Sequence, residues 1–216
     1  MPKESGLSVY PTTQPVAALI LAHGAGAGQR SPFMVSAARA MSERGILSAT
    51  FDFPYMAQGR KVPDRGPVLE QAWRSAIADA STRTEFAGLP LFIGGKSMGG
   101  RIASQAAASG PLPISGLVFL GYPLHPPGKP TASRDSHLPD IAVPMLFVQG
   151  SNDAFGTAQE IRELLPRLDR ATVVHEVMGG DHSFKVPARS GRTQASVLEE
   201  VFDVVARFIR STIGRG

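Results

Sequence analysis

The strongest chemical signal in the sequence is a serine enclosed by glycines. Residues 95–99 read Gly-Lys-Ser-Met-Gly, a match to the pattern G-x-S-x-G with Ser97 at its centre. The apolar run Leu89–Gly94 precedes this motif, and a helix is predicted to begin at Met98. Between a strand and a helix, such a serine lies on a sharp, strained turn that exposes its hydroxyl. The pattern indicates a nucleophile, and the alternative is a glycine-rich turn with an incidental serine.

A serine hydroxyl needs a general base, and the histidine best placed to act as one is His182. It lies in Gly-Gly-Asp-His-Ser-Phe, just after the predicted strand Thr172–Met178. Because the loop follows a strand of the same predicted sheet, we expect it at the sheet edge that carries Ser97. The other histidines fit this role less well, because they lie inside a strand, at the start of a glycine loop or in a proline-rich segment: His175, His23, His125 and His137.

The base in turn needs a carboxylate that holds its tautomer and stabilises the imidazolium. Asp153 directly follows the predicted strand Val143–Gly150, which makes it the best candidate. The chain order serine, aspartate, histidine differs from the orders of chymotrypsin and subtilisin. Two other aspartates are weaker candidates. The side chain of Asp181 should diverge from that of its neighbour His182. Asp52 ends a strand, but it precedes Ser97 in the chain and so does not fit this order.

Acyl transfer also needs donors for the developing oxyanion. One is expected to be the backbone N–H of Met98, the residue after the nucleophile. The second is expected from the loop His-Gly-Ala-Gly-Ala-Gly over residues 23–28, with Ala25 as first candidate and Gly26 as second. A glycine-rich loop can also hold phosphate, but this one lacks the third glycine of G-x-G-x-x-G and the ending of a P-loop. Nucleotide binding is therefore not expected.

Short apolar runs alternate with amphipathic segments along the chain. This alternation predicts βαβ units and a parallel sheet with helices on both faces, with ligands beyond the carboxyl ends of the strands. No repeat or linker divides the chain, so we predict one domain over residues 1–216. The predicted strands are Ala17–His23, Leu47–Phe53, Leu89–Gly94, Ile114–Gly121, Val143–Gly150 and Thr172–Met178, and the predicted helices are Phe33–Arg44, Pro67–Phe86, Met98–Ser109, Ala158–Leu165 and Arg192–Ile213.

Two segments fall outside this alternation. Residues 1–15 are interpreted as an N-terminal extension, and residues 122–142 as a proline-rich loop near the active site. A loop of that length in a compact domain is usually functional or mobile. The alternative is a rigid cover that does not touch the substrate. The side chains predicted to contact substrate from this loop and from the end of the second predicted strand are Tyr55, Tyr122, Leu124 and His125.

Four cationic residues surround these candidates. Arg134 or Lys129 could receive an anionic group of the substrate. Lys96 is expected to project away from the nucleophile as a packing or surface residue, and Arg101, one turn into the predicted helix, could pair with a nearby carboxylate.

Composition sets wider limits. The 216 residues include no cysteine, which excludes disulfides, thiol catalysis and cysteine-based metal sites. A hydrophobic fraction of 43% supports a buried core and argues against disorder. The net charge of +4 is scattered and only 7% of residues are aromatic, so no nucleic-acid partner is expected. No metal is expected, because the histidines and acidic residues lack ligand spacing, and no cofactor is expected, because acyl transfer by serine, histidine and aspartate needs none.

The start of the sequence offers no apolar segment typical of a signal peptide. The longest early apolar run, residues 16–22, is far too short to span a bilayer. We therefore expect a cytoplasmic protein without a membrane partner, and the oligomeric state stays open.

Several segments together resemble a small bacterial family of predicted α/β-hydrolases. They are HGAGAG, FDFPY, GGKSMGGR, LGYPLHPPGKP, LFVQGSNDAFG and GGDHSF. The family is similar to dienelactone hydrolases and related to the eukaryotic testis-expressed protein 30 group. The resemblance runs from about Ala17 to the C-terminus. It implies an α/β-hydrolase fold, namely a single mostly parallel sheet of six to seven strands with helices on both faces and no large cap domain.

The resemblance also implies the triad Ser97, Asp153 and His182. We therefore expect a serine hydrolase of carboxylesterase type that acts on a small-molecule acyl substrate through an acyl-enzyme. Peptide, amide or thioester cleavage on the same fold is the first alternative. The second is a non-catalytic interaction module, since related eukaryotic members include a scaffolding subunit of a chromatin-modifying complex.

Overall fold

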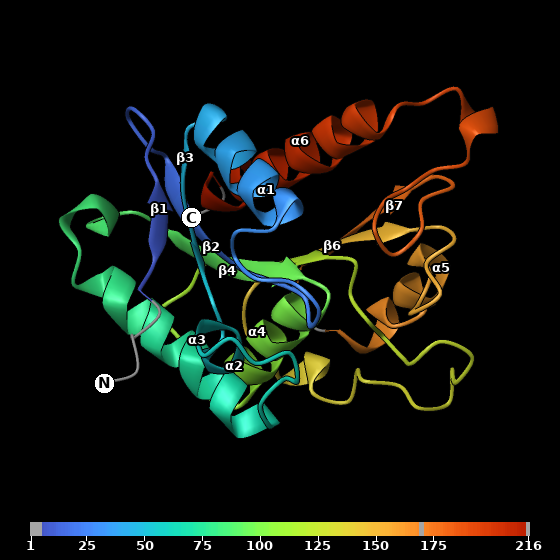
Figure 1. The fold of residues 1–216 in the computed structure, drawn as a ribbon, viewed down its shortest axis with the longest axis horizontal. Helices are drawn as coiled ribbons and strands as arrows, with labels where there is room; N and C mark the ends of the chain where they lie inside the picture. The colour runs from blue at the N-terminus through green and yellow to red at the C-terminus, as the bar shows by residue number, and fades with distance from the viewer. Residues whose placement is uncertain (1–5, 169–170, 215–216) are drawn as a thin grey trace.

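The computed structural model describes residues 6–168 and 171–214 and is organised around one seven-stranded sheet (Figure 1). Its strand order is β1-β3-β2-β4-β5-β6-β7. β1 pairs with β3 in antiparallel orientation and all other neighbours are parallel. The strands are β1 (Ser8–Tyr10), β2 (Ala17–Ala22), β3 (Ile46–Phe51), β4 (Leu91–Lys96), β5 (Gly116–Leu120), β6 (Met145–Gly150) and β7 (Thr172–Val177).

Helices cover both faces of this sheet. In Figure 1, α1 and α6 lie above the sheet, and α2, α3 and α4 lie below it. α5 shares the apolar core of the lower face through Ile161. The α-helices are α1 (Pro32–Glu43), α2 (Pro54–Ala57), α3 (Gly66–Ser81), α4 (Met98–Ala108), α5 (Ala158–Arg162) and α6 (Gln194–Ile213), and the 3-10 helices are η1 (Thr84–Phe86), η2 (Leu138–Asp140), η3 (Leu165–Arg167) and η4 (Ala188–Ser190).

The central strands read as continuous apolar runs because both of their faces are covered. Every residue of β2, β3, β5 and β6 is buried. Side chains that alternate along each strand enter two separate cores: Ile20 joins the core beneath α3 and α4, whereas Leu19 and Leu21 join the core beneath α1 and α6. Parallel strands buried on both faces are expected to lack the alternation of apolar and polar residues that marks half-exposed strands.

All six predicted strands and five predicted helices are present, with shifted ends. β4 begins at Leu91 and runs on to Lys96, because Gly94 and Gly95 pair with both β2 and β5. The predicted helix Pro67–Phe86 was too long: α3 ends at Ser81 and is followed by the separate turn η1. At the last helix, the Thr193 side chain accepts a hydrogen bond from the Ser196 N–H, which places the helix start at Gln194 rather than Arg192.

One strand and one α-helix were missed by the sequence patterns. β1 lies in the segment interpreted as an extension, and its three residues pair with the outer side of β3. α2 is a single turn that begins at Pro54. Both are too short to leave a periodic signal, and β1 exists only because an edge of the sheet is there to pair with it.

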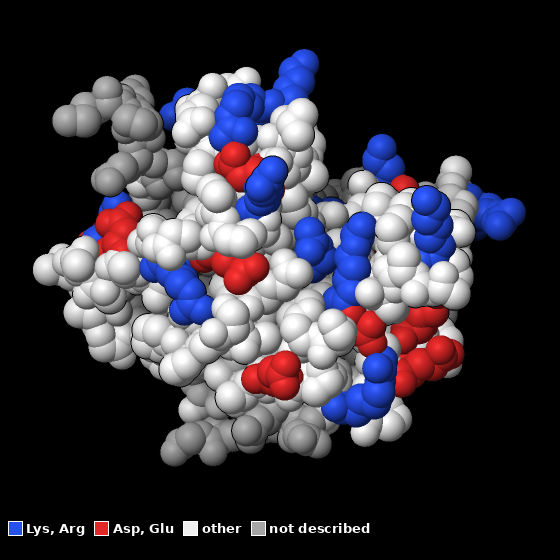
Figure 2. Space-filling model, turned by 90° about the horizontal axis from the view of Figure 1, so that it is seen from below, with Lys and Arg blue, Asp and Glu red and all other residues white. Residues whose placement is uncertain are grey.

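The connection between β5 and β6, residues 121–144, is long and contains only η2. It runs along one side of the carboxyl edge of the sheet (Figure 1). Within the described residues, no helix is both long and apolar enough to cross a membrane. Basic and acidic side chains are interspersed on the face seen in Figure 2.

Candidate active site

Ser97 lies on the turn between β4 and α4 with a backbone conformation that is rare for a residue with a side chain. Its φ is 51° and its ψ is −118°. Its N–H donates to the carbonyl oxygen of Leu120 at 3.1 Å, which ties the turn to the neighbouring strand. Left-handed backbone at a non-glycine residue costs on the order of 1–3 kcal/mol and tends to occur at functional sites.

The turn is possible because α4 packs directly against the backbone of β2. A Cβ atom placed on Gly99 would lie 2.2 Å from the carbonyl oxygen of Ala22 and 2.8 Å from that of His23. No side chain fits at this distance. The second glycine of the motif therefore brings the helix close enough to hold Ser97 at the sheet edge.

Three side chains from three loops form one hydrogen-bonded relay. His182 Nε2 lies 2.8 Å from Ser97 Oγ, and His182 Nδ1 lies 2.8 Å from Asp153 Oδ2. The Asp153 side chain is fully shielded from solvent, whereas 21% of the His182 side chain is exposed. The structure thus brings together the three residues that the sequence predicted as nucleophile, base and acid, and it leaves the base accessible to a substrate.

The carboxylate of Asp153 is held on both of its oxygens. Oδ1 accepts from the backbone N–H of Phe155 at 2.8 Å, and Oδ2 accepts from Gln149 Nε2 at 2.9 Å. Gln149 is itself buried and accepts the N–H of Tyr122 at 2.7 Å. Sequence reasoning missed Gln149, although a polar residue at the end of an otherwise apolar strand was a visible signal.

The rival carboxylates have other roles. Asp52 accepts from the N–H of Gln29 at 2.7 Å and lies 3.5 Å from His23. Asp181 Oδ1 accepts from the N–H groups of Ser183 and Lys185, which closes the turn after His182. Neither carboxylate is hydrogen-bonded to His182 among the described contacts, so Asp153 is the partner of this imidazole.

The other histidines are also engaged elsewhere. His125 pairs with Glu160, His175 with Glu200 and His137 with Ser104. None of these pairs includes a hydroxyl at the carboxyl edge of β4.

Lys96 departs from its predicted placement. Instead of projecting away from the site, its Nζ donates to the carbonyl oxygen of His182 and lies 5.6 Å from the centroid of the Phe184 ring. Burial lowers the pKa of Lys96 to about 8, and the charges of Asp153 and Asp181 only partly offset this effect. Lys96 is thus a half-buried cation that anchors the loop of His182.

Replacing Lys96 with methionine is expected to stabilise the protein at pH 7 and to lower kcat. The pKa of Lys96 is lower in the folded state than the ordinary 10.5, so its charge opposes folding below pH 8. Removing it should raise the free energy of unfolding by at most about 3 kcal/mol. Wild-type stability should approach that of the variant as the pH rises from about 8 to 10.5, where the lysine is neutral in the folded state. Loss of the anchor should cost on the order of tenfold in kcat.

Denaturant unfolding at pH 7 and pH 10, with kcat measured at pH 7, checks both effects. The exposed Lys129 gives a matched control, and Lys129→Met should show no pH-dependent gain. A stability difference between wild type and Lys96→Met that does not change with pH would contradict this role of the buried charge.

His23 orients the loop that was predicted to supply an oxyanion donor. Its Nε2 accepts from the backbone N–H of Phe53 at 3.2 Å, so the proton lies on Nδ1, which donates to the carbonyl oxygen of Gly24 at 2.8 Å. Burial lowers the pKa of His23, which favours this neutral form. In a trans peptide the C=O and the following N–H point in opposite directions. The His23 contact therefore turns the N–H of Ala25 away from the histidine.

Replacing His23 with phenylalanine is expected to lower kcat about 10²-fold while KM changes little, because an oxyanion donor acts mainly in the transition state. Steady-state kinetics on an activated ester, with a thermal unfolding check, measures this. The surface variant His175→Gln is the control and should stay within about twofold of wild type. An unchanged kcat in the His23→Phe variant would contradict the prediction that the N–H of Ala25 is an oxyanion donor.

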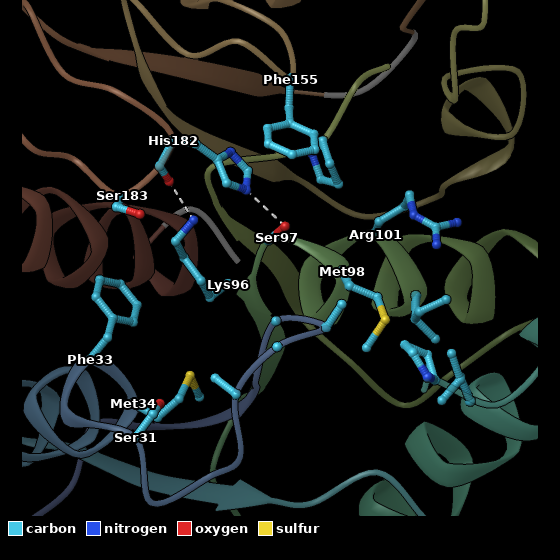
Figure 3. A pocket seen from close by; sticks show the side chains of 18 of the residues that line it. Ser31, Phe33, Met34, Lys96, Ser97, Met98, Arg101, Phe155, His182 and Ser183 are labelled. Carbon is cyan, nitrogen blue, oxygen red and sulfur yellow. Dashed lines mark hydrogen bonds between the residues drawn. The ribbon is translucent and has the colours of Figure 1, made fainter. Parts of the chain in front are cut away.

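The relay opens into a cavity of about 1150 Å³. Ser97 and Met98 lie between two sides of it, with Phe33 and Met34 on one side and Arg101 on the other (Figure 3). The Phe155 ring packs 4.3 Å from the His182 ring, centroid to centroid, and also lines the cavity. Ala25 and Gly26 line it as well, next to the nucleophile.

The residues predicted to contact substrate are not in this lining, and the structure corrects those four assignments. Tyr55 and Tyr122 are fully buried, and their hydroxyls donate to the carbonyl oxygens of Ala25 at 3.0 Å and Arg134 at 2.8 Å. Leu124 lies in the core beneath α4. His125 is turned to Glu160. The two tyrosines thus support the cavity wall from behind, while Phe33, Met34 and Phe155, which the sequence analysis did not single out, face the cavity.

Among the residues that the structure describes, no group of three or more histidine, aspartate or glutamate side chains is placed to hold a metal ion.

Comparisons with known proteins point to one family. The family described as "Alpha/beta hydrolase domain" matches residues 15–210. A dienelactone hydrolase from Anabaena variabilis is 18% identical, with a TM-score of 0.74 over 95% of this chain and 90% of that one. Est1E from Butyrivibrio proteoclasticus, with ferulic acid bound, is 17% identical, with a TM-score of 0.72 over 96% of both chains. A monoacylglycerol lipase from Paleococcus ferrophilus is 17% identical, with a TM-score of 0.69 over 96% of this chain and 99% of that one.

Proposed function

Because this chain belongs to the alpha/beta hydrolase domain family, we propose that it is a serine hydrolase that cleaves carboxylic ester bonds. The observation that carries the proposal is the relay from Ser97 Oγ through His182 to Asp153, with both hydrogen bonds at 2.8 Å. Nucleophile, base and orienting carboxylate within hydrogen-bond reach are the geometric signature of an activated serine.

In the proposed reaction, Ser97 Oγ attacks the carbonyl carbon of the ester while His182 Nε2 takes its proton. Asp153 keeps Nδ1 protonated and stabilises the imidazolium. His182 then donates the proton to the departing alcohol, which leaves Ser97 acylated. A water molecule, deprotonated by the same histidine, attacks the acyl-enzyme and releases the carboxylic acid.

The oxyanion is proposed to be held by the backbone N–H groups of Met98 and Ala25. Met98 is the first residue of α4, and the first N–H groups of a helix have no partner within the helix. The positive end of the helix dipole lies at the same point. The tether from His23 to Gly24 supports Ala25 rather than Gly26 as the second donor.

Ester cleavage is preferred over amide cleavage as the first substrate class. A lipase is among the similar solved structures, and the cavity lining near the nucleophile includes the apolar side chains of Phe33, Met34 and Phe155. Thioesters and amides are alternatives that the same experiment distinguishes.

The test is labelling of the purified protein with a fluorescent fluorophosphonate, followed by a panel of esters, thioesters and amides of matched acyl length. Wild type should be labelled, Ser97→Ala should not, and esters should react fastest. Absence of labelling together with absence of turnover would favour a non-catalytic module. Labelling that persists in Ser97→Ala would place the nucleophile elsewhere.

A further inference from the structure

One side of the cavity holds two arginines that the ester reaction leaves without a role. Arg101 projects from α4 on the side of Ser97 opposite Phe33 (Figure 3). Arg134 comes from the long connection between β5 and β6 and lines the same cavity. The two guanidinium groups influence one another: burial is the main cause that lowers the pKa of Arg101, and the charge of Arg134 is the next.

Arg101 has hydrogen-bonding capacity that the protein does not use. Its Nη1 donates to Gln105 Oε1 at 3.2 Å, but its Nε is buried without a hydrogen-bond partner among the residues that the structure describes. A buried donor left unpaired is unfavourable unless another group supplies the acceptor.

Arg134 is held in place by its backbone. Its N–H donates to the carbonyl oxygen of Leu124, and its own carbonyl oxygen accepts from Tyr122, both at 2.8 Å. Within the described part of the chain, the guanidinium makes a single long hydrogen bond, 3.4 Å from Nη1 to the carbonyl oxygen of Pro123. The buried tyrosine therefore fixes the position from which this cation reaches the cavity.

No carboxylate in the described part of the chain neutralises either arginine. Neither guanidinium lies within 4.0 Å of an aspartate or glutamate in residues 6–168 and 171–214. Of the two acidic residues that line this side of the cavity, Asp64 pairs with Arg60 at 2.6 Å. Glu70 is outside ion-pair distance of both arginines, and its charge is the weakest of the effects on Arg101. Two like charges thus face a shared space without a counter-ion.

We propose that Arg101 and Arg134 bind a carboxylate carried by the ester substrate, at a point away from the bond that is cleaved. This inference rests on the proposed function. The planar fork of a guanidinium matches the two oxygens of a carboxylate. The substrate class is therefore esters with a free carboxylate, such as half-esters of dicarboxylic acids or esters of carboxyphenols.

The kinetic test compares carboxylates with their neutral carboxamide counterparts. In the first pair the carboxylate or carboxamide is on the acyl side of the ester: 4-nitrophenyl hydrogen glutarate and the 4-nitrophenyl ester of glutaric acid monoamide. In the second pair it is on the alcohol side: 3-carboxyphenyl butanoate and 3-carbamoylphenyl butanoate. In at least one pair, kcat/KM for the carboxylate should exceed that for the carboxamide by about 10- to 100-fold at low salt.

The variants Arg101→Gln and Arg134→Gln should each lower this ratio at least about fivefold, and the double variant should bring it close to one. The ratio within a pair cancels any general loss of activity or stability. Lys129→Gln is the matched control, because Lys129 lies on the same connection as Arg134 but is exposed and outside the cavity lining. It should leave the ratio unchanged. Ratios near or below one in both wild-type pairs, or a preference retained by the double variant, would overturn the proposal.

A binding measurement separates this proposal from the proposed function. Calorimetric titration of Ser97→Ala protein with monomethyl glutarate needs no turnover, and its Kd should rise at least about tenfold when Arg101→Gln and Arg134→Gln are added. If neutral and anionic esters are hydrolysed equally well, the carboxylate site is contradicted and the hydrolase proposal stands. If the protein is neither labelled nor active on any ester, but its binding of monomethyl glutarate depends on the two arginines, only the hydrolase proposal is contradicted. A Kd that does not depend on the arginines would defeat the carboxylate site.

Discussion

Replacing Ser97 with alanine is expected to lower kcat for ester hydrolysis by about 10⁴- to 10⁶-fold. The variant keeps the cavity and the oxyanion donors, but no atom remains to form the acyl-enzyme. His182→Ala should cause a loss of similar size, because a serine hydroxyl without its base is a poor nucleophile. The double variant should be about as slow as either single variant, since residues that act as one unit do not contribute additively. Steady-state kinetics with an activated ester measures all three.

The exposed Ser136, on the connection between β5 and β6, provides the matched control for this series. Ser136→Ala should match wild type within about twofold. A Ser97→Ala protein that keeps more than a tenth of the wild-type kcat would contradict the assignment of the nucleophile. Multiplicative losses in the double variant would instead indicate that His182 acts independently of Ser97.

Replacing Gly99 with alanine is expected to lower the stability of the protein strongly. Its Cβ would lie 2.2 Å from the Ala22 carbonyl oxygen, a backbone atom that cannot rotate away. Ala22 is fixed in turn, because it pairs with both Phe51 and Gly95 in the sheet. Either α4 moves off the sheet or the β2 backbone distorts. We expect a loss of at least about 3 kcal/mol in the free energy of unfolding, and a fall in Tm of roughly 6–12 °C.

Gly26→Ala is the control for stability, because no atom lies within 4 Å of a Cβ placed there. Its Tm should be within about 2 °C of wild type. Gly99→Ala should also displace Ser97, so the protein that does fold should react more slowly with a fluorophosphonate. Equal melting temperatures for the two alanine variants would show that α4 is not pressed against β2 as the structure has it.

The sequence by itself determined which residues converge. Ser97, Asp153 and His182 each follow a predicted strand, and parallel strands bring their carboxyl ends to one edge of a sheet. Residue type and chain order were then sufficient to select them, because the chemistry of acyl transfer needs a hydroxyl, an imidazole and a carboxylate in contact. Strand order places the three loops at one edge, and the packing around Gly99, Gln149 and Lys96 then brings the side chains into hydrogen-bond contact.

The interior of the sheet was predictable for a similar reason. A strand covered on both faces needs apolar residues at every position, so segments such as Ala17–Ala22 are recognisable without their partners. β1 was not recognisable, since three half-buried residues carry no pattern and their pairing depends on the edge of β3.

Only the tertiary structure decided which side chains face the cavity. Tyr55 and Tyr122 stand at strand ends like Ser97, Asp153 and His182, yet both rings turn into the core, where an apolar ring is more stable and each hydroxyl still finds a backbone carbonyl. Lys96 turns inward to the His182 carbonyl, and Arg101 Nε finds no hydrogen-bond partner among the described residues. The direction of a loop side chain depends on contacts distant in sequence, and those contacts exist only once the layers have packed.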